Sequence, residues 1–448
     1  MTWSRRGVLV GLVSTAGCTA VGPDYKTPDA RLEANFLTGG SADIGDVSKD
    51  RWWRDFNDAM LTKYVERGLQ TNLDVRTALA RIEQAQAALR QTGAAAQING
   101  AASASATRSG GDGIPTTTTE TYAQTGAFVF DLFGGFRRGR ERSLAELEAA
   151  GFLAADARLA FLSGLIGNYV AARFHQTAAA LTRKSIGLRR RTVDLVQLQV
   201  DEGAATQLDL VRAQADLQAT QADLPGFIAG FNASAFAVAT LLDQPLKGIH
   251  RDMQAGAAQP LPRRNRSAGT PANLLRNVPR VRASERQFAA SVAAIGVAEA
   301  QLYPSLTLSG SVGGGTAKRW SFGPELAIPV LNRGILQARR DQAVAAAKEA
   351  ELNWRNAVRQ SVQSVEVSAS NLSNQRRQVN LLRQSVASQE KSLALTRDVY
   401  ENGALNLLDL IETERATLGL QISLATALRD AANSWVELQI ATGRGWNT

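Results

Sequence analysis

The sequence predicts a mainly α-helical protein with a small β part, built from a helix–strand–strand–helical hairpin unit that occurs twice. Alanine-rich segments with apolar residues at helical spacing fill most of the 448 residues. Each half also contains two stretches in which apolar and polar residues alternate, a pattern typical of strands. The segment from Tyr400 to Leu410 repeats, at the same offset, the glycine, the alanine and the Leu-Asp-Leu triplet of the segment from Val200 to Leu210. Two matching segments of this kind indicate a duplicated chain.

Composition excludes several classes of function. The net charge is +9, but basic and acidic residues are interleaved and no cluster of aromatic residues accompanies them, so a nucleic-acid-binding protein is not expected. The densest basic stretch, from Arg263 to Arg286, is interpreted as a solvated linker and the start of a helix. Cys18 is the single cysteine, and His175 and His250 are the two histidines. These residues cannot form a disulfide framework or a His/Cys metal cluster, so we expect no catalytic residues, no metal site and no cofactor.

The amino terminus has the pattern of a secretion signal. Residues 1–17 contain Arg5 and Arg6, a short apolar core and small residues just before Cys18. This arrangement resembles the bacterial lipobox, in which the cysteine becomes the lipidated first residue, and the resemblance implies a covalent lipid on Cys18. An ordinary signal peptide with a chance cysteine is the alternative, and the two arginines are also compatible with a twin-arginine signal. Residues 18–54 are predicted to be an extended tether.

The first repeat is predicted to span residues 55–250. It starts with two helices separated by a cap at Thr71 and Asn72, and strands follow at about 98–108 and 120–133.

A long helix then reaches a hairpin tip at about 200–209, where Gly203 ends it. At about 1.5 Å per residue, a helix of about 65 residues would be roughly 100 Å long. The return helix is expected from Gln207 to about Leu242, with a kink or break at Pro225. Its apolar part from Phe227 is interpreted as a packed helix, not a membrane span.

A linker at 251–271 leads to the second repeat at 272–448. Strands are predicted at about 303–313 and 319–331, and Pro324 and Pro329 argue that the latter is an edge strand or a strand end. A second long helix leads to the tip at about 400–409 with Gly403, and a return helix runs from Leu407 to about Ile440.

The four strands have apolar faces and aromatic ends that suit a lipid-facing position. Four strands cannot close a barrel, because the smallest transmembrane barrels use about eight. An open sheet edge is not tolerated in lipid. If these strands enter a membrane, several chains must therefore contribute to one barrel.

Motifs in this order resemble those of the outer membrane factors, the TolC-like efflux channels, and most closely their NodT-type lipoprotein branch. The motifs are Trp52-Trp53 with Phe56-Asn57-Asp58, Phe130 to Gly135, Leu274-Leu275, Ala283 to Arg286, Ile295 to Ala300, Tyr303 to Leu306, and Gly443 to Trp446. The resemblance implies a homotrimer in which four strands per chain form a barrel of about twelve strands in the outer membrane, continued by a helical barrel across the periplasm. It also implies a passive duct that carries small molecules, a periplasmic adaptor, and an inner-membrane pump, often of the resistance-nodulation-division (RND) type.

The resemblance further implies that the hairpin tips close the periplasmic end. By position, Leu408, Asp409, Glu412 and Arg415 match family residues that form the constriction and its salt-bridge latch. The last three are spaced three apart and so lie near one helix face, where several chains would form charged rings. Asp209 in the first tip is either a helix cap or a second gate residue.

Two other functions remain open on the sequence. One is the outer membrane channel of a type I protein-secretion system, which has the same fold. The other is a structural coiled-coil envelope lipoprotein, and the four alternating strands argue against it.

Overall fold

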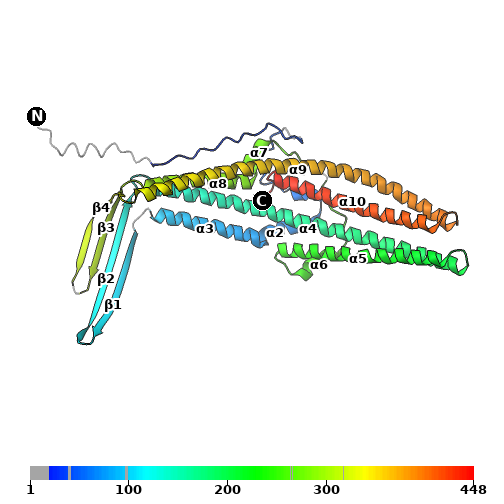
Figure 1. Cartoon of the computed structure of the whole chain (residues 1–448), viewed down its shortest axis with the longest axis horizontal. Coiled ribbons are helices and arrows are strands. Elements are labelled where there is room, and N and C mark those ends of the chain that lie inside the picture. The colour runs from blue at the N-terminus through cyan, green and yellow to red at the C-terminus, as the bar shows by residue number, and fades with distance from the viewer. Residues whose placement is uncertain are drawn as a thin grey trace. The chain divides into compact units, whose positions relative to one another are not determined.

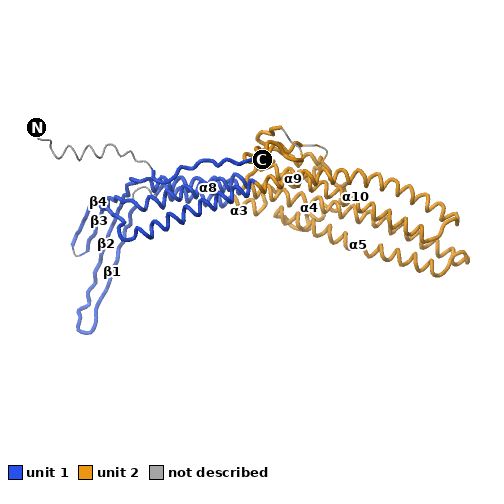
Figure 2. The backbone as a smooth tube through the Cα atoms, turned by 45° about the horizontal axis from the view of Figure 1, so that its top comes forward, with its two compact units in different colours: residues 1–31, 79–153, 280–358 blue, residues 32–78, 154–279, 359–448 orange. Residues whose placement is uncertain are grey.

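The computed structural model describes residues 20–38, 42–95, 99–262, 264, 266–315 and 317–447. The predicted signal peptide with Arg5 and Arg6, and the predicted lipidation site Cys18, lie outside these residues. The chain forms two compact units (Figure 2). Unit 1 comprises residues 1–31, 79–153 and 280–358, and unit 2 comprises residues 32–78, 154–279 and 359–448.

Helices dominate the chain, and the strands come in two pairs, one in each half (Figure 1). In chain order the elements are η1 (Trp52–Phe56), α2 (Ala59–Thr71), α3 (Leu73–Ala95), β1 (Asn99–Gly111), β2 (Ile114–Phe130), α4 (Gly135–Asp201), α5 (Gln207–Leu241), α6 (Leu246–Gln254), α7 (Pro271–Asn277), α8 (Pro279–Ala300), β3 (Ser305–Gly314), β4 (Arg319–Ala327), α9 (Arg333–Glu401) and α10 (Leu407–Ala441). The four strands overlap their predicted ranges, although β2 begins earlier than expected, at Ile114, and both β2 and β4 end earlier. Pro329 therefore follows the strand and does not lie on it, whereas Pro324 lies on β4 as predicted.

Unit 1 contains one four-stranded antiparallel sheet in the order β1-β2-β3-β4. Its two edges are β1 and β4, which explains how β4 tolerates Pro324, a residue without a backbone donor. The register places most of the large apolar residues of the four strands on one face, with Val129 on the other. Across the sheet, this face carries Ala102, Ala104, Tyr122, Phe128, Phe130, Leu306, Leu308, Val312, Trp320, Phe322 and Leu326.

The opposite face of the sheet is polar. Hydroxyl groups pair across the strands, at 2.8 Å between Ser105 and Thr121 and at 2.8 Å between Ser311 and Ser321. Trp320 and Phe322, on the apolar face, are 81% and 72% exposed. The sheet thus has one wide apolar face on which Trp320 and Phe322 are left largely uncovered by the described residues.

An aromatic cluster forms part of the core of unit 2. Trp435 packs edge-on against Trp52 and Phe56, with ring centroids 5.6 and 5.3 Å apart. Asn72 caps α3, as predicted, because its side chain accepts a hydrogen bond from the N–H of Val75 at 3.0 Å.

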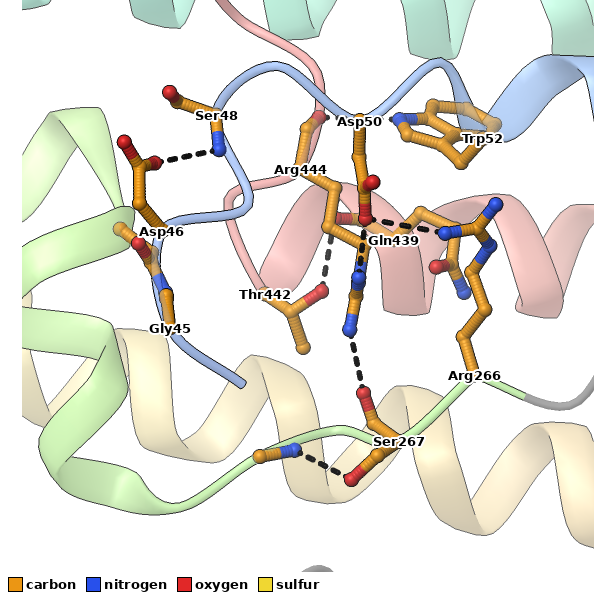
Figure 3. Close-up of polar contacts among 12 residues, drawn as sticks. Gly45, Asp46, Ser48, Asp50, Trp52, Arg266, Ser267, Gln439, Thr442 and Arg444 are labelled. Atoms are coloured by element: carbon orange, nitrogen blue, oxygen red, sulfur yellow. Dashed lines mark hydrogen bonds and ion pairs between the residues drawn. The ribbon is translucent and has the colours of Figure 1, made fainter. Parts of the chain in front are cut away.

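The structure corrects the interpretation of the basic stretch as a solvated linker. Arg266 forms ion pairs with Asp50 at 3.1 Å and Asp55 at 2.6 Å. Arg444, which is buried, pairs with the same Asp50 at 2.5 Å and donates to the carbonyl of Ser267 at 2.7 Å (Figure 3). The segment is therefore held against the carboxyl end of the chain by compensated charges. Sequence spacing could not reveal this, because the acidic partners lie about two hundred residues earlier in the chain.

Two further expectations concern Pro225 and the predicted tether. The helix α5 continues through Pro225 without a break, and its apolar part buries Ala235, Val238 and Ala239 within unit 2. In the predicted tether, the described residues before η1 have no regular secondary structure, and Phe36 and Val47 are buried. By length and composition alone, α4 and α5 contain stretches apolar enough to cross a membrane.

Candidate functional site at the hairpin tips

The two hairpin tips have the same backbone geometry. Gly203 and Gly403 have φ angles of +74° and +76°, which lie in the left-handed region that glycine adopts without strain. At the first tip the N–H of Ala204 donates to the carbonyl of Gln199 at 2.7 Å, and the N–H of Gly203 donates to that of Val200 at 3.0 Å. The second tip repeats both bonds, at 3.1 and 2.9 Å. Each long helix thus ends in a Schellman motif, which reverses the chain.

The return helices are capped differently, and this separates Asp209 from Asp409. In the first tip Thr206 and Asp209 form a capping box, in which the Asp209 carboxylate accepts bonds from the hydroxyl of Thr206 at 2.6 Å and from its N–H at 3.2 Å. These bonds, and then the charge of Arg212, lower the pKa of Asp209 below its usual 3.8. Asp209 is therefore a cap. In the second tip Asn406 is the cap and accepts from the N–H of Asp409 at 3.0 Å.

Because the Asn406 side chain forms the cap, the Asp409 carboxylate takes no part in it. Within the part of the chain that the structure describes, neither Asp409 nor Glu412 has a side-chain hydrogen bond or an ion pair. Asp409 is half-buried, Glu412 is exposed, and Leu408 is 45% exposed. The second tip thus presents one apolar and two acidic side chains that are not satisfied by their own protomer.

Arg415 does not pair with either acid. Its Nε lies 2.5 Å from a carboxylate oxygen of Asp216 on α5, so it joins the second hairpin to the first. The Arg415 side chain is 59% exposed, whereas that of Asp216 is 3% exposed. The spacing of Asp409, Glu412 and Arg415 predicted a shared helix face but not this partner.

A buried network of charges, which the sequence did not indicate, lies behind Arg415. Asp216 also bonds Arg189 on α4 at 2.9 Å, and Glu414 on α10 bonds Arg397 on α9 at 2.6 Å. Arg189 and Glu414 are 3.9 Å apart, which connects the two pairs across all four helices. Burial lowers the pKa of Arg189, while Asp216 and Glu414 oppose that change. The network therefore fastens the two hairpins together.

Apolar packing joins the same helices nearer the tips. Tyr400 and Leu410 of the second hairpin pack with Val196 and Leu210 of the first. The Tyr400 hydroxyl donates to the side chain of Gln199 at 3.1 Å. Burial, and then the charge of Asp209, raise the pKa of this tyrosine.

We found no metal site in the described residues, in which no three His, Cys, Asp or Glu side chains gather as ligands. Of the two histidines, His250 bonds Asn232 at 2.8 Å. The ring of His175 lies beside Gly230 and is partly buried, which lowers its pKa.

Comparison with known proteins gives concordant results. Residues 65–240 and 270–444 match the sequence model of the family described as outer membrane efflux protein. The chain is 38% identical to Nodulation protein T of Rhizobium leguminosarum bv. trifolii over 96% of its own length and 95% of that protein. It is 25% identical to the pyoverdine export outer membrane protein OpmQ of Pseudomonas aeruginosa, with 97% and 96% covered. Its structure is similar to that of the outer-membrane channel OprN, with a TM-score of 0.85, 27% identity, and 96% and 100% of the two chains covered.

Proposed function

The chain belongs to the outer membrane efflux protein family, and on this basis we propose that it is the outer membrane duct of a tripartite efflux system. In this proposal the duct is a passive homotrimer that receives small molecules from a periplasmic adaptor and an inner-membrane pump. Membership of a transport family agrees with the expectation that the chain is not an enzyme.

The open sheet is the observation that carries the proposal. Its apolar face suits lipid, but β1 and β4 are both edges that pair with no further strand among the described residues. Unpaired backbone groups cost several kcal/mol each in hydrocarbon, so the edges must pair with other copies. Three copies would supply about twelve strands, enough for a closed barrel, whereas a single chain has too few.

The tips supply the proposed gate. Asp409 and Glu412 have no side-chain partner among the described residues of the protomer, and Leu408 is exposed beside them. In a symmetric trimer each would form a ring, and rings of acids repel one another and favour cations. In this proposal Asp209 belongs to the helix cap and not to the gate, and its bonds to Thr206 support that assignment. Arg415 acts in the latch through Asp216.

The names of the relatives support small molecules as the class of cargo. One relative is named for pyoverdine export and another, SrpC of Pseudomonas putida, for solvent efflux. We infer that the present chain also exports small molecules and that selectivity lies in the pump. A channel for type I protein secretion is the alternative within this fold. The uncovered apolar face argues against a purely structural coiled-coil lipoprotein, because a periplasmic spacer has no use for such a face.

We also propose that Cys18 carries a covalent lipid, palmitate among its acyl groups, which anchors the chain to the outer membrane while the helices lie in the periplasm. The signal pattern before this cysteine supports the proposal.

Two measurements test the proposal. Chemical cross-linking in intact outer membranes should give trimers that resist mild detergent. Only single chains after cross-linking would contradict the proposed trimer. Deletion of the gene should raise susceptibility to toxic small molecules, and the intact gene should restore resistance. Loss of a secreted protein without any change in susceptibility would favour the secretion system.

A further inference from the structure

An open apolar pocket of about 1110 Å³ lies in unit 1, at the base of the sheet. It is formed where β2 leads into α4, where α8 leads toward β3, and where β4 leads into α9. Its lining is largely apolar and includes Phe133, Phe136, Tyr303, Val330 and Leu331. Val330 and Leu331 are 71% and 101% exposed. A contiguous exposed apolar surface of this kind marks a site that another apolar group covers.

The amino-terminal segment 20–25 is seated beside this pocket. The N–H of Val21 donates to the carbonyl of Phe133 at 3.1 Å, and the Phe133 ring lines the pocket, stacked on Tyr303 at 4.6 Å. Tyr25 secures the other end of the segment, where its hydroxyl donates to Glu285 at 3.0 Å. The start of the described chain is therefore tied to the pocket wall.

Arg138 of α4 is the residue that holds the segment. Its guanidinium donates to the carbonyls of Val21 and Gly22, both at 3.1 Å, and to the carboxylate of Asp24 at 2.7 Å. The side chain is buried, and Glu141 at 2.8 Å adds a second charge partner.

The backbone of segment 20–25 also lies very close to the backbone of the neighbouring elements at two glycines. A side-chain carbon on Gly134 would lie 2.5 Å from the Cβ of Ala20, and one on Gly22 would lie 2.5 Å from the Cα of Gly296. Both distances are far shorter than van der Waals contact, so the segment fits only because these positions are glycine. Ala20 is thereby fixed against the residue between Phe133 and Gly135, both of which line the pocket.

The pocket needs an apolar occupant, and the chain carries one close by. Cys18 precedes Ala20 by two residues, which span at most about 7 Å. We propose that the pocket is an acyl-chain site filled by one chain of the lipid on Cys18, and that Arg138 is the positioning residue that directs the lipid into it. The inference rests on the lipidation proposed above but not on conductance or gating. It makes the lipid part of the packing at the base of the sheet, in addition to a membrane anchor.

Metabolic labelling with a palmitate analogue that carries a diazirine near its end tests this proposal. After irradiation of intact cells, mass spectrometry of the purified full-length protein locates the adducts. We expect the amino-terminal acylated peptide to be cross-linked to peptides from 129–136 or 327–336. The same adducts without a link to the amino-terminal peptide would mean that a free membrane lipid fills the pocket, and would overturn the assignment. A pocket without adducts, covered instead by a neighbouring protomer in cross-linked trimers, would overturn it as well.

Two pairs of variants add controls. Gly139→Leu places a side chain in the pocket and should remove the adduct, whereas Gly151→Leu on the same helix points into open space and should not. Arg138→Met should lower the adduct and raise hydrogen exchange in peptide 20–25 about tenfold, the worth of one charge-assisted hydrogen bond. Arg142→Met removes an exposed pair with Glu146 and should leave both readouts unchanged. If hydrogen exchange in peptide 20–25 is as fast in the wild type as in Arg138→Met, Arg138 does not hold this segment against the pocket, and the proposal is overturned. The two proposals can fail separately. If the acyl chain is cross-linked to the pocket but the purified protein does not conduct, this inference holds and the proposed function fails.

Discussion

Replacement of Asp216 by asparagine should release the two hairpins from one another. The Asp216 side chain is 3% exposed, and its carboxylate bonds Arg189 at 2.9 Å and Arg415 at 2.5 Å. Asparagine keeps the shape but loses the charge, so buried Arg189 keeps its hydrogen bonds to the Asp216 carbonyl and the Thr220 hydroxyl but has only Glu414, at 3.9 Å, as an acidic partner among the described residues. Breaking a buried pair costs about 3–5 kcal/mol. Because Glu414 remains and asparagine can still accept a hydrogen bond, we expect the lower end, about 3 kcal/mol or about 100-fold in the equilibrium that separates the hairpins.

Arg415→Ala provides the matched comparison. The Arg415 side chain is 59% exposed, and solvent-screened pairs of this kind are worth at most about 1 kcal/mol. We therefore expect only a few-fold effect from this variant. Both variants should raise single-channel conductance and leakage of large antibiotics, with Asp216→Asn far ahead. An equal or larger effect of Arg415→Ala would refute the assignment of the latch to the buried network. If neither variant changes conductance or leakage, the network has no role in closing the channel.

Three further predictions concern the caps and the carboxyl end. Gly403→Ala should destabilise the trimer by about 1–2 kcal/mol, because the φ angle of Gly403 is +76°. The control Gly419→Ala lies inside a helix with open space around it and should stabilise the trimer by about 0.5–1 kcal/mol. Thermal melting distinguishes the two outcomes. Asp209→Asn should cost about 1 kcal/mol at neutral pH. Because the folded pKa of Asp209 lies below 3.8, its contribution is complete above that value and is lost as the pH falls through the lowered pKa, so melting of the variant should depend less on acid pH than that of the wild type. Arg444→Met leaves Asp50 with Arg266 alone and should lower stability by about 3 kcal/mol, and an unchanged denaturation midpoint would contradict the role of this network.

Periodicity and glycine positions were sufficient to predict the long helices, the existence of four strands and both tips, but not the short helix α6 or the start of β2. These elements depend on local spacing, which is visible in one sequence. The capping role of Asp209 could also have been settled, because Thr206 stands three residues before it in a capping box and Asn406 replaces that threonine in the second tip.

The buried network and the seat of the amino-terminal segment could not be predicted. Asp216, Arg189 and Glu414 lie on three different helices, and nothing in their local spacing marks them as partners. Arg138 stands in an arginine-rich run that resembles any solvated helix start. Only the fold brings these charges to partners distant in the chain.

Single-channel recording in planar bilayers tests the central claim most directly. Purified trimers should conduct weakly at rest and prefer cations, and a variant with Asp409→Ala and Glu412→Ala should lose that preference, because the proposed acidic rings would be gone. If neither protein conducts, although both insert as detergent-resistant trimers, the chain is not the proposed duct.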